Sequence, residues 1–173
     1  MNLTRVLLVV TVGLVLQMAL ARFAVGDRWV FDLVLVAVVF VALSWGPIAG
    51  MWAGTLGGLV QDALSGDIIG VGGLAKTVAG LAAGVAGAQF VVSSAAGRVA
   101  TVAVVTIGHR LLVVSLLALA DQRWSDGGWM AMLMETGLNG CAGLVAFKAT
   151  EWVPGAMRQT RELRRPSLSK RRW

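Results

Sequence analysis

The chain consists mainly of long apolar segments separated by short breaks that are polar or contain glycine and proline. A helix that spans a bilayer needs roughly 20 mostly apolar residues. We expect spanning helices at residues 4–24, 30–45, 47–65, 71–92, 98–119 and 129–150. The pattern therefore predicts an all-α, polytopic membrane bundle of about six transmembrane helices, with residues 1–153 as one membrane domain.

The division between the second and third segments depends on Trp45-Gly46-Pro47. Pro47 suits the first turn of a new helix, where its missing N–H costs no hydrogen bond. We therefore expect a tight hairpin at residues 45–47. One long kinked helix is the alternative, and it would reduce the number of spans to five.

Composition supports a membrane domain. Apolar residues make up 57% of the 173 residues and charged residues only 14%, so there is too little polar surface to cover a soluble globule. Residues 6–21 also resemble the apolar part of a signal peptide, but equally apolar segments follow, which favours a first spanning helix. The six segments leave no room for a separate soluble catalytic domain.

The net charge of +6 belongs to the C-terminal end of the chain. Residues 1–153 hold eight Lys/Arg and eight Asp/Glu, whereas residues 154–173 hold seven basic residues and one acid. We expect this tail to be a cytoplasmic extension that contacts anionic lipid headgroups.

The distribution of Lys and Arg also predicts orientation, because basic residues favour the cytoplasmic side. With six spans, Arg5 and Arg98 share a side with the basic tail. Arg22, Arg28 and Arg123 fall on the opposite side, each close to an acid. We therefore expect both ends in the cytoplasm (N-in/C-in).

Small residues recur at helical spacing. Gly46, Gly50, Gly54 and Gly58 follow one another at intervals of four, which places them on one helical face. Further small-residue faces comprise Gly80, Gly84 and Ala88 on the fourth segment and Gly137, Gly140 and Gly143 on the sixth. Such faces let two helices approach closely. Packing within the chain is the favoured interpretation, and docking of a partner's transmembrane helix is the alternative.

Ionisable residues inside apolar segments are candidates for function because they are costly in lipid. Asp62 ends the third segment and Lys76 lies in the fourth, so we expect them either to pair across the turn or to contact a ligand. Arg110, in the middle of the fifth segment, needs an acceptor, and Glu135 on the sixth is the candidate. His109 is interpreted as a packing residue rather than a proton relay.

The sequence contains no motif for enzyme chemistry and no Cys/His cluster for a metal, so we expect no enzyme, no cofactor and no metal site. The glycine-rich run at 66–73 lacks the Lys-Ser/Thr ending of a phosphate loop, and we interpret it as a surface turn or short re-entrant segment. The basic tail suits lipid rather than nucleic acid because it is attached to a membrane domain.

The stretch from Ser44 to Gly84 resembles the rod-shape-determining protein MreD family. The resemblance rests on the order Trp45-Gly46-Pro47, the spaced glycines, then Leu59-Val60-Gln61-Asp62-Ala63-Leu64-Ser65-Gly66 and Ile69-Gly70-Val71-Gly72-Gly73. Gln17 in the first segment also looks like this family. The long basic tail has no counterpart in the pattern.

The resemblance implies a non-enzymatic subunit of the cell-elongation machinery in the bacterial cytoplasmic membrane. Such proteins bind the bitopic shape protein MreC beside the glycosyltransferase and transpeptidase of lateral wall synthesis. They are similar in fold to the substrate-binding subunits of energy-coupling-factor transporters. A small-molecule-binding transporter subunit is therefore the second hypothesis, and a proton-coupled carrier or membrane enzyme centred on His109 is the third.

Overall fold

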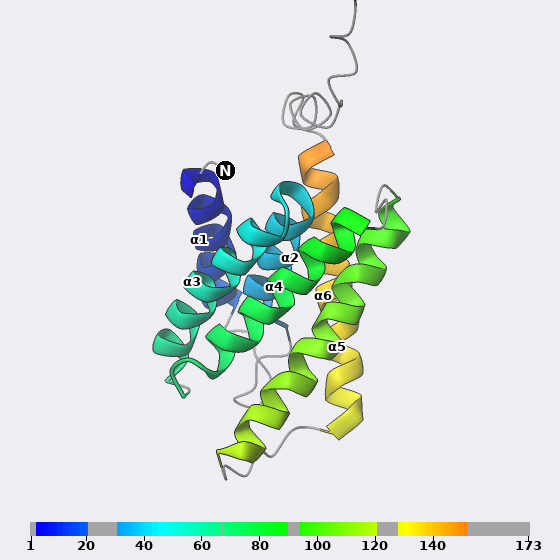
Figure 1. Ribbon diagram of the computed structural model, residues 1–173. Coiled ribbons are helices and arrows are strands. Elements are labelled where there is room, and N and C mark those ends of the chain that lie inside the picture. The colour runs from blue at the N-terminus through cyan, green and yellow to red at the C-terminus, as the bar shows by residue number, and fades with distance from the viewer. Residues whose placement is uncertain (1–2, 21–30, 67, 90–93, 121–127, 152–173) are drawn as a thin grey trace, which may run out of the picture.

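The computed structural model describes residues 3–20, 31–66, 68–89, 94–120 and 128–151. These residues form six helices: α1 (Leu3–Leu20), α2 (Leu33–Trp45), α3 (Pro47–Ser65), α4 (Val71–Gln89), α5 (Ala95–Leu119) and α6 (Gly128–Glu151). The helices pack as a single up-and-down bundle (Figure 1). The predicted all-α polytopic bundle is confirmed, and the basic tail at 154–173 lies outside the described residues.

The predicted break between the second and third helices is also confirmed. Gly46 alone separates α2 from α3, and Pro47 occupies the first turn of α3. Gly46 has a φ of +96°, a conformation that costs glycine little because it has no Cβ. Its N–H donates to the Ala42 carbonyl at 2.9 Å, which completes the last turn of α2. The alternative of one long kinked helix is therefore wrong.

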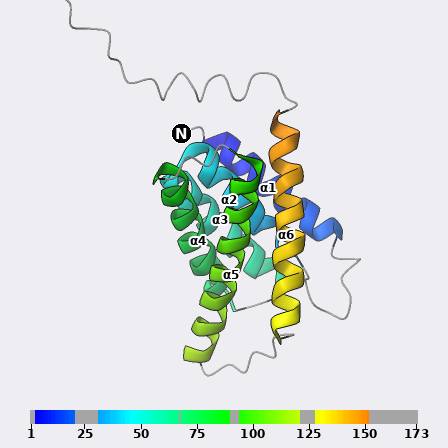
Figure 2. The same cartoon turned by 90° about the vertical axis from the view of Figure 1, so that its right-hand side faces the viewer.

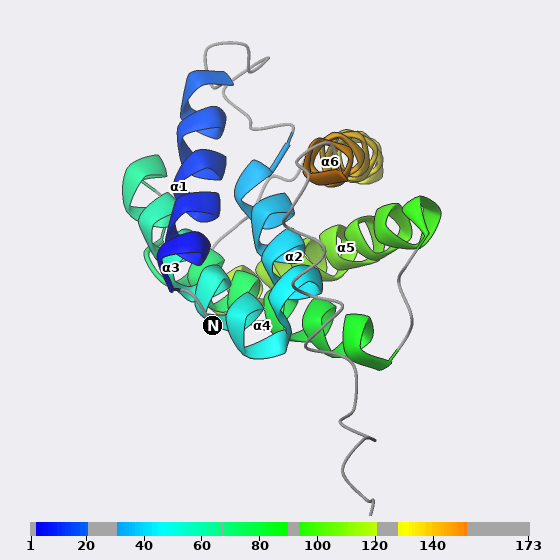
Figure 3. The ribbon, with the colours of Figure 1, turned by 90° about the horizontal axis from the view of Figure 1, so that it is seen from above.

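Helix α2 is the centre of the bundle. Viewed from above in Figure 3, it lies among α1, α3, α4, α5 and α6, and all five contact it. Its buried residues are Val34, Leu35, Val36, Ala37, Val38, Val39, Val41 and Ala42. A helix that is apolar on every side is stable only when it is covered on every side. Here the cover is protein rather than lipid.

The helices differ in their suitability to cross a bilayer. Among the described residues, α1, α4, α5 and the 129–149 part of α6 are long and apolar enough to span. Helix α2 has 13 residues, which corresponds to a length of about 20 Å. The hydrocarbon core of a bilayer is roughly 30 Å thick. One end of α2 therefore lies inside the bundle.

Helices α3 and α4 make the most extensive contact in the bundle, and their glycines explain it. A Cβ on Gly54 would collide with the backbone carbonyl of Lys76, and one on Gly58 would lie 2.6 Å from the Cα of Gly73. From the α4 side, a Cβ on Gly80 would meet the backbone of Gly50. The two backbones are in direct contact, so these glycine faces are used within the chain.

Gly46 and Gly84 complete the account of the predicted glycine faces. A Cβ on Gly84 would meet Pro47 at the start of α3, so Gly84 belongs to the same contact. A Cβ on Gly46 would meet nothing within 4 Å. Gly46 therefore makes no close helix contact within the described residues, and glycine is required there by the positive φ of the turn.

Helices α5 and α6 form the second half of the bundle (Figure 2): α5 packs against α4 and α6, and α6 also contacts α2. Their contact uses fewer glycines: a Cβ on Gly143 would lie 3.0 Å from Val102, and one on Gly140 would lie 3.6 Å from Val99. Gly137 faces outward, with nothing within 4 Å of its Cβ position.

Replacing Gly54 with alanine tests the backbone contact between α3 and α4. We expect Gly54→Ala to destabilise the protein by about 1–3 kcal/mol, because a single methyl group overfills this contact. The matched control is Gly137→Ala, which adds the same methyl group in open space and should raise helix stability by about 0.5–1 kcal/mol. The measurement is thermal unfolding of both variants in detergent, and equal transition temperatures would contradict the role assigned to Gly54.

Candidate functional site

The N-terminus of α2 lies inside the bundle, and polar side chains satisfy its free N–H groups. The Asp32 carboxylate caps the helix by accepting from the Leu35 N–H at 2.9 Å. The Val34 N–H donates to Gln17 Oε1 of α1 at 3.1 Å, and the Asp32 N–H donates to Asn139 Oδ1 of α6 at 2.9 Å. The first N–H groups of a helix have no partner within it. Side chains of α1 and α6, together with the N-cap residue Asp32, therefore satisfy the start of α2.

Asp32 also forms the central ion pair of the structure. Its Oδ2 lies 2.7 Å from Lys76 Nζ on α4, and both side chains are buried. The expected pairing of Lys76 with Asp62 is wrong. Asp32, at the depth where α2 begins, is the carboxylate that Lys76 reaches.

Asp62 has a different role, at the start of α4. Its Oδ2 accepts from the Gly70 N–H at 2.9 Å and from the Gly73 N–H at 3.0 Å. A carboxylate in this place satisfies free N–H groups and complements the positive end of the helix dipole. The glycine-rich run at 66–73 is the turn that lets α4 begin against Asp62, and Gly70 has a φ of +104° in it. Asp62 fixes the α3–α4 turn.

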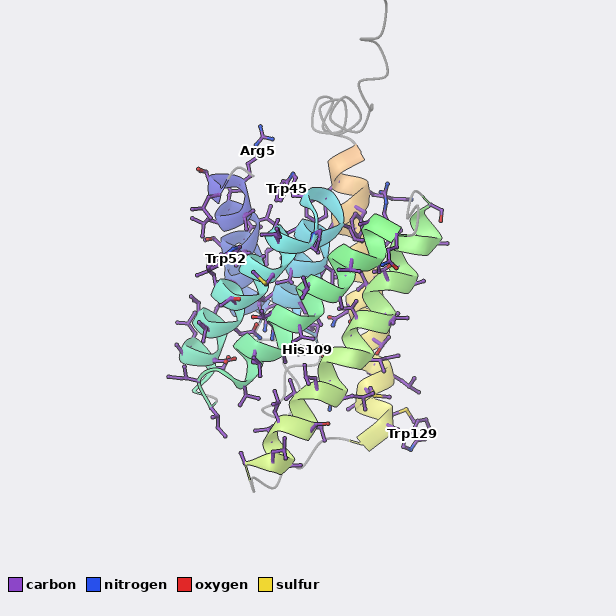
Figure 4. All side chains as sticks on the ribbon, viewed as in Figure 1. Arg5, Trp45, Trp52, His109 and Trp129 are labelled. Carbon is purple, nitrogen blue, oxygen red and sulfur yellow. The ribbon has the colours of Figure 1, made fainter. Side chains whose placement is uncertain are left out.

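His109 and Arg110 point to different partners, as neighbouring residues on a helix must. Arg110 pairs with Glu135 of α6, which confirms the partner expected from the sequence. His109 Nε2 lies 3.5 Å from Lys76 Nζ. Figure 4 shows His109 within the bundle rather than at either end. This contact joins α5 to the Asp32–Lys76 pair.

Two further polar residues complete the group. Asn139, which accepts from the Asp32 N–H, donates from Nδ2 to Thr106 Oγ1 of α5 at 3.4 Å. Both residues have no exposed surface. We use the name polar cluster for Asp32, Lys76, Thr106, His109, Arg110, Glu135 and Asn139. The polar cluster links α2, α4, α5 and α6.

The polar cluster is balanced in charge. Asp32 compensates Lys76, and Glu135 compensates Arg110. Buried charges are tolerated when they are paired and hydrogen-bonded, whereas removing one partner leaves an uncompensated charge in an apolar surrounding. Among the described residues, no group of three or more His, Cys, Asp or Glu side chains is placed to hold a metal ion. The ion pairs and hydrogen bonds of the polar cluster hold the helices in register.

Sequence patterns pointed to Lys76, His109, Arg110 and Glu135 but missed the roles of Asp32, Thr106 and Asn139. The signal for Asp32 was present, because an Asp directly before an uninterrupted apolar run is typical of a helix N-cap. Asn139 stands in the middle of an apolar helix without any local motif. Its role depends on where α2 starts.

Removing the charge of Lys76 tests the pair with Asp32. We expect Lys76→Met to cost about 3–5 kcal/mol, because it leaves the Asp32 carboxylate buried without a counter-ion. Adding Asp32→Asn should restore most of the loss, because asparagine keeps the N-cap acceptor without the charge. The measurement is the thermal unfolding of the single and double variants in detergent.

The exposed Lys148 supplies the matched control, since Lys148→Met removes the same charge from the surface. We expect this variant to unfold as the unchanged protein does. A double variant that is no more stable than Lys76→Met alone would contradict the pairing of Asp32 with Lys76.

A family model described as rod shape-determining protein MreD matches residues 1–123, which include α1 to α5. No curated protein and no solved structure matches the chain. The family match covers more than half of the 173 residues. The chain is a multi-pass membrane protein and belongs to the MreD family of rod shape-determining proteins.

Proposed function

We propose that this protein is a non-enzymatic scaffold of the bacterial cell-elongation complex, where it docks the transmembrane helix of a bitopic partner of the MreC type. Family membership supports a role in determining rod shape. The glycosyltransferase and transpeptidase of lateral wall synthesis are the further partners that this role implies. The protein acts in the cytoplasmic membrane.

The observation that carries this proposal is an outward small-residue face on α5, within the region that matches the family. Val104 and Leu111 are 69% and 58% exposed, and Gly108 between them has nothing within 4 Å of its Cβ position. Ser115 continues the same face one turn further on and is exposed. Glycine and serine at a helix surface let another transmembrane helix approach closely.

The glycines of α3 and α4 are less suited to docking a partner. Gly50, Gly54 and Gly58 are buried against α4, so enlarging them alters the fold before it alters a partner surface. Gly108 offers the same kind of surface without an internal contact. This difference is why we place docking on α5.

The transporter-subunit alternative draws no support from the buried charges. A ligand site formed by Lys76, His109 and Arg110 needs these groups to be free for the ligand. Lys76 is instead paired with Asp32, and Arg110 with Glu135. We therefore retain the scaffold role as the one proposed function.

The proposal includes an orientation with both ends in the cytoplasm. Arg5 lies at the upper end of Figure 4, where α5 begins with Arg98 in its first turn and α6 ends with Lys148 in its last. The remaining described basic residues, Lys76 and Arg110, belong to the polar cluster. Arg22, Arg28 and Arg123 lie outside the described residues. An excess of Lys and Arg at one end supports placing that end inside.

Enlarging Gly108 tests the docking face. We expect Gly108→Leu to weaken co-purification with the bitopic partner by about tenfold, a loss of about 1.4 kcal/mol, and to make rod-shaped cells round. The matched control is Gly137→Leu on α6, which is equally open but lies outside the family match. Unchanged co-purification and shape with Gly108→Leu, or equal loss with Gly137→Leu, would count against this face.

Reporter fusions test the orientation. We expect green fluorescent protein fused to the C-terminus to fluoresce, and alkaline phosphatase at the same point to be inactive, because the tail is placed in the cytoplasm. Fusions at the α5–α6 connection should behave in the opposite way. The measurement is whole-cell fluorescence and phosphatase activity, and an active C-terminal phosphatase would rule out the proposed orientation.

A further inference from the structure

The helices reach different distances towards the lower end of the bundle. Helix α1 has 18 residues, whereas α5 has 25 and α6 has 24. In Figure 1 and Figure 2, α1 ends well above the lower ends of α5 and α6, while the upper ends of α1 and α6 differ less in height. The difference in length is therefore concentrated at the lower end of α1.

Hydrogen bonds at the start of α2 fix the depth of α1. Gln17 Oε1, in the last turn of α1, accepts from the Val34 N–H at 3.1 Å. At the same helix start, Asn139 Oδ1 of α6 accepts from the Asp32 N–H at 2.9 Å. Gln17, Asp32 and Asn139 are all buried. Gln17 and Asn139 therefore lie at a similar depth, which we call the reference level.

Below the reference level, α1 has little apolar chain left. Residues 18–20 extend about 5 Å beyond Gln17 along the helix axis, and tilting the helix only shortens this reach. In the sequence, Ala21 is the last apolar residue before Arg22. Leu20 is 37% exposed, so this end of α1 is open to its surroundings.

Helices α5 and α6 continue much further below the reference level. In α6, residues 129–138 lie below Asn139 and extend about 15 Å. Trp129 is 69% exposed and lies near the lower end of Figure 4, and an exposed indole prefers the headgroup level. In α5, Thr106 binds Asn139, and the helix runs on to the exposed Leu119. The apolar surface of α6 therefore extends about 10 Å further than that of α1.

The connection that follows α1 is rich in charge. Residues 21–30 join the end of α1 to the start of α2 and include Arg22, Asp27 and Arg28. Ionisable side chains are costly in hydrocarbon. This connection therefore requires water or headgroups near the end of α1, at a depth where α5 and α6 still need an apolar surrounding.

The apolar run of α1 is also short in total. As a helix, residues 6–21 between Arg5 and Arg22 span about 24 Å, whereas the hydrocarbon core of a bilayer is roughly 30 Å thick. Sliding α1 towards the lower surface would break the bond of Gln17 to α2 and draw Arg5 inwards from its upper end (Figure 4). The Arg22 side chain can cover part of the difference by extending towards the headgroups. A thinner bilayer accommodates the rest.

We propose that the protein thins the bilayer beside α1, in the leaflet at the lower end of Figure 1. Phospholipid acyl chains cover the face formed by the exposed Val12, Leu16 and Leu20. The headgroups of this leaflet lie on the order of 5–10 Å closer to the bilayer centre at α1 than at α6. The inference goes beyond the scaffold role and depends neither on it nor on a protein partner.

Spin labels that report depth test the thinning. Single labels at Leu20 of α1 and Met134 of α6, both exposed, are placed in a Cys141→Ser background of the full chain. The protein is reconstituted in vesicles of phospholipids with oleoyl chains. Collisions of the label with oxygen, which concentrates in hydrocarbon, are compared with collisions with a water-soluble nickel complex by electron paramagnetic resonance.

Met134 lies further below the reference level than Leu20, so a bilayer of even thickness places the label at Met134 closer to the lower surface. We expect the opposite: nickel collisions dominate at Leu20, and oxygen collisions dominate at Met134. A label at the exposed Val12 should also favour oxygen, because the middle of α1 lies in hydrocarbon. Oxygen dominance at Leu20 equal to that at Met134, or nickel dominance at Val12, overturns the proposal.

Arg22→Leu tests whether the short apolar run causes the thinning. The substitution extends this run to residue 26, before Asp27, which adds about 7 Å as a helix. We expect the label at Leu20 to change from nickel to oxygen dominance, whereas the matched control Arg22→Lys keeps the charge and should leave nickel dominant. No change with Arg22→Leu, or an equal change with Arg22→Lys, overturns the proposal. Where Arg22→Leu does not fold, the comparison of Leu20 with Met134 decides.

Discussion

The start of α2 inside the bundle is the constraint on which the rest of the structure depends. A helix that begins away from water exposes N–H groups that need acceptors, and an unpaired buried group of this kind costs about 1–3 kcal/mol. Gln17, Asn139 and the Asp32 carboxylate supply the acceptors from α1, α6 and α2 itself. The charge that Asp32 brings then requires Lys76 on α4. One short central helix thereby determines the position of three others.

The glycines of α3 and α4 let α4 approach the start of α2 closely. Because the two backbones touch at Gly54 and Gly58, α4 lies close enough for Lys76 to reach Asp32. The same contact removes these glycines from the surface. Gly108 of α5 and Gly137 of α6, by contrast, have nothing within 4 Å of their Cβ positions.

Charge balance allows the polar cluster to be buried. Asp32 with Lys76 and Glu135 with Arg110 allow four charges to be buried, provided that neither pair is broken. His109 of α5 contacts Lys76 of α4 and so lies where the two halves of the bundle meet.

Local patterns by themselves determined the number of the helices and placed their ends within four residues of those observed. The length of the apolar segments sets the helices. Trp45-Gly46-Pro47 ends one helix and begins the next, because Gly46 takes a positive φ and Pro47 suits a first helical turn. The register of Gly50, Gly54 and Gly58, and the depth of Arg110 relative to Glu135, follow from helical spacing. Only the tertiary structure decided that Lys76 meets Asp32 rather than Asp62, that Asp62 starts α4, and that Asn139 supports α2. The partners of Lys76 and Asn139 depend on the depth at which α2 begins, and that depth is set by five surrounding helices rather than by the residues next to Asp32.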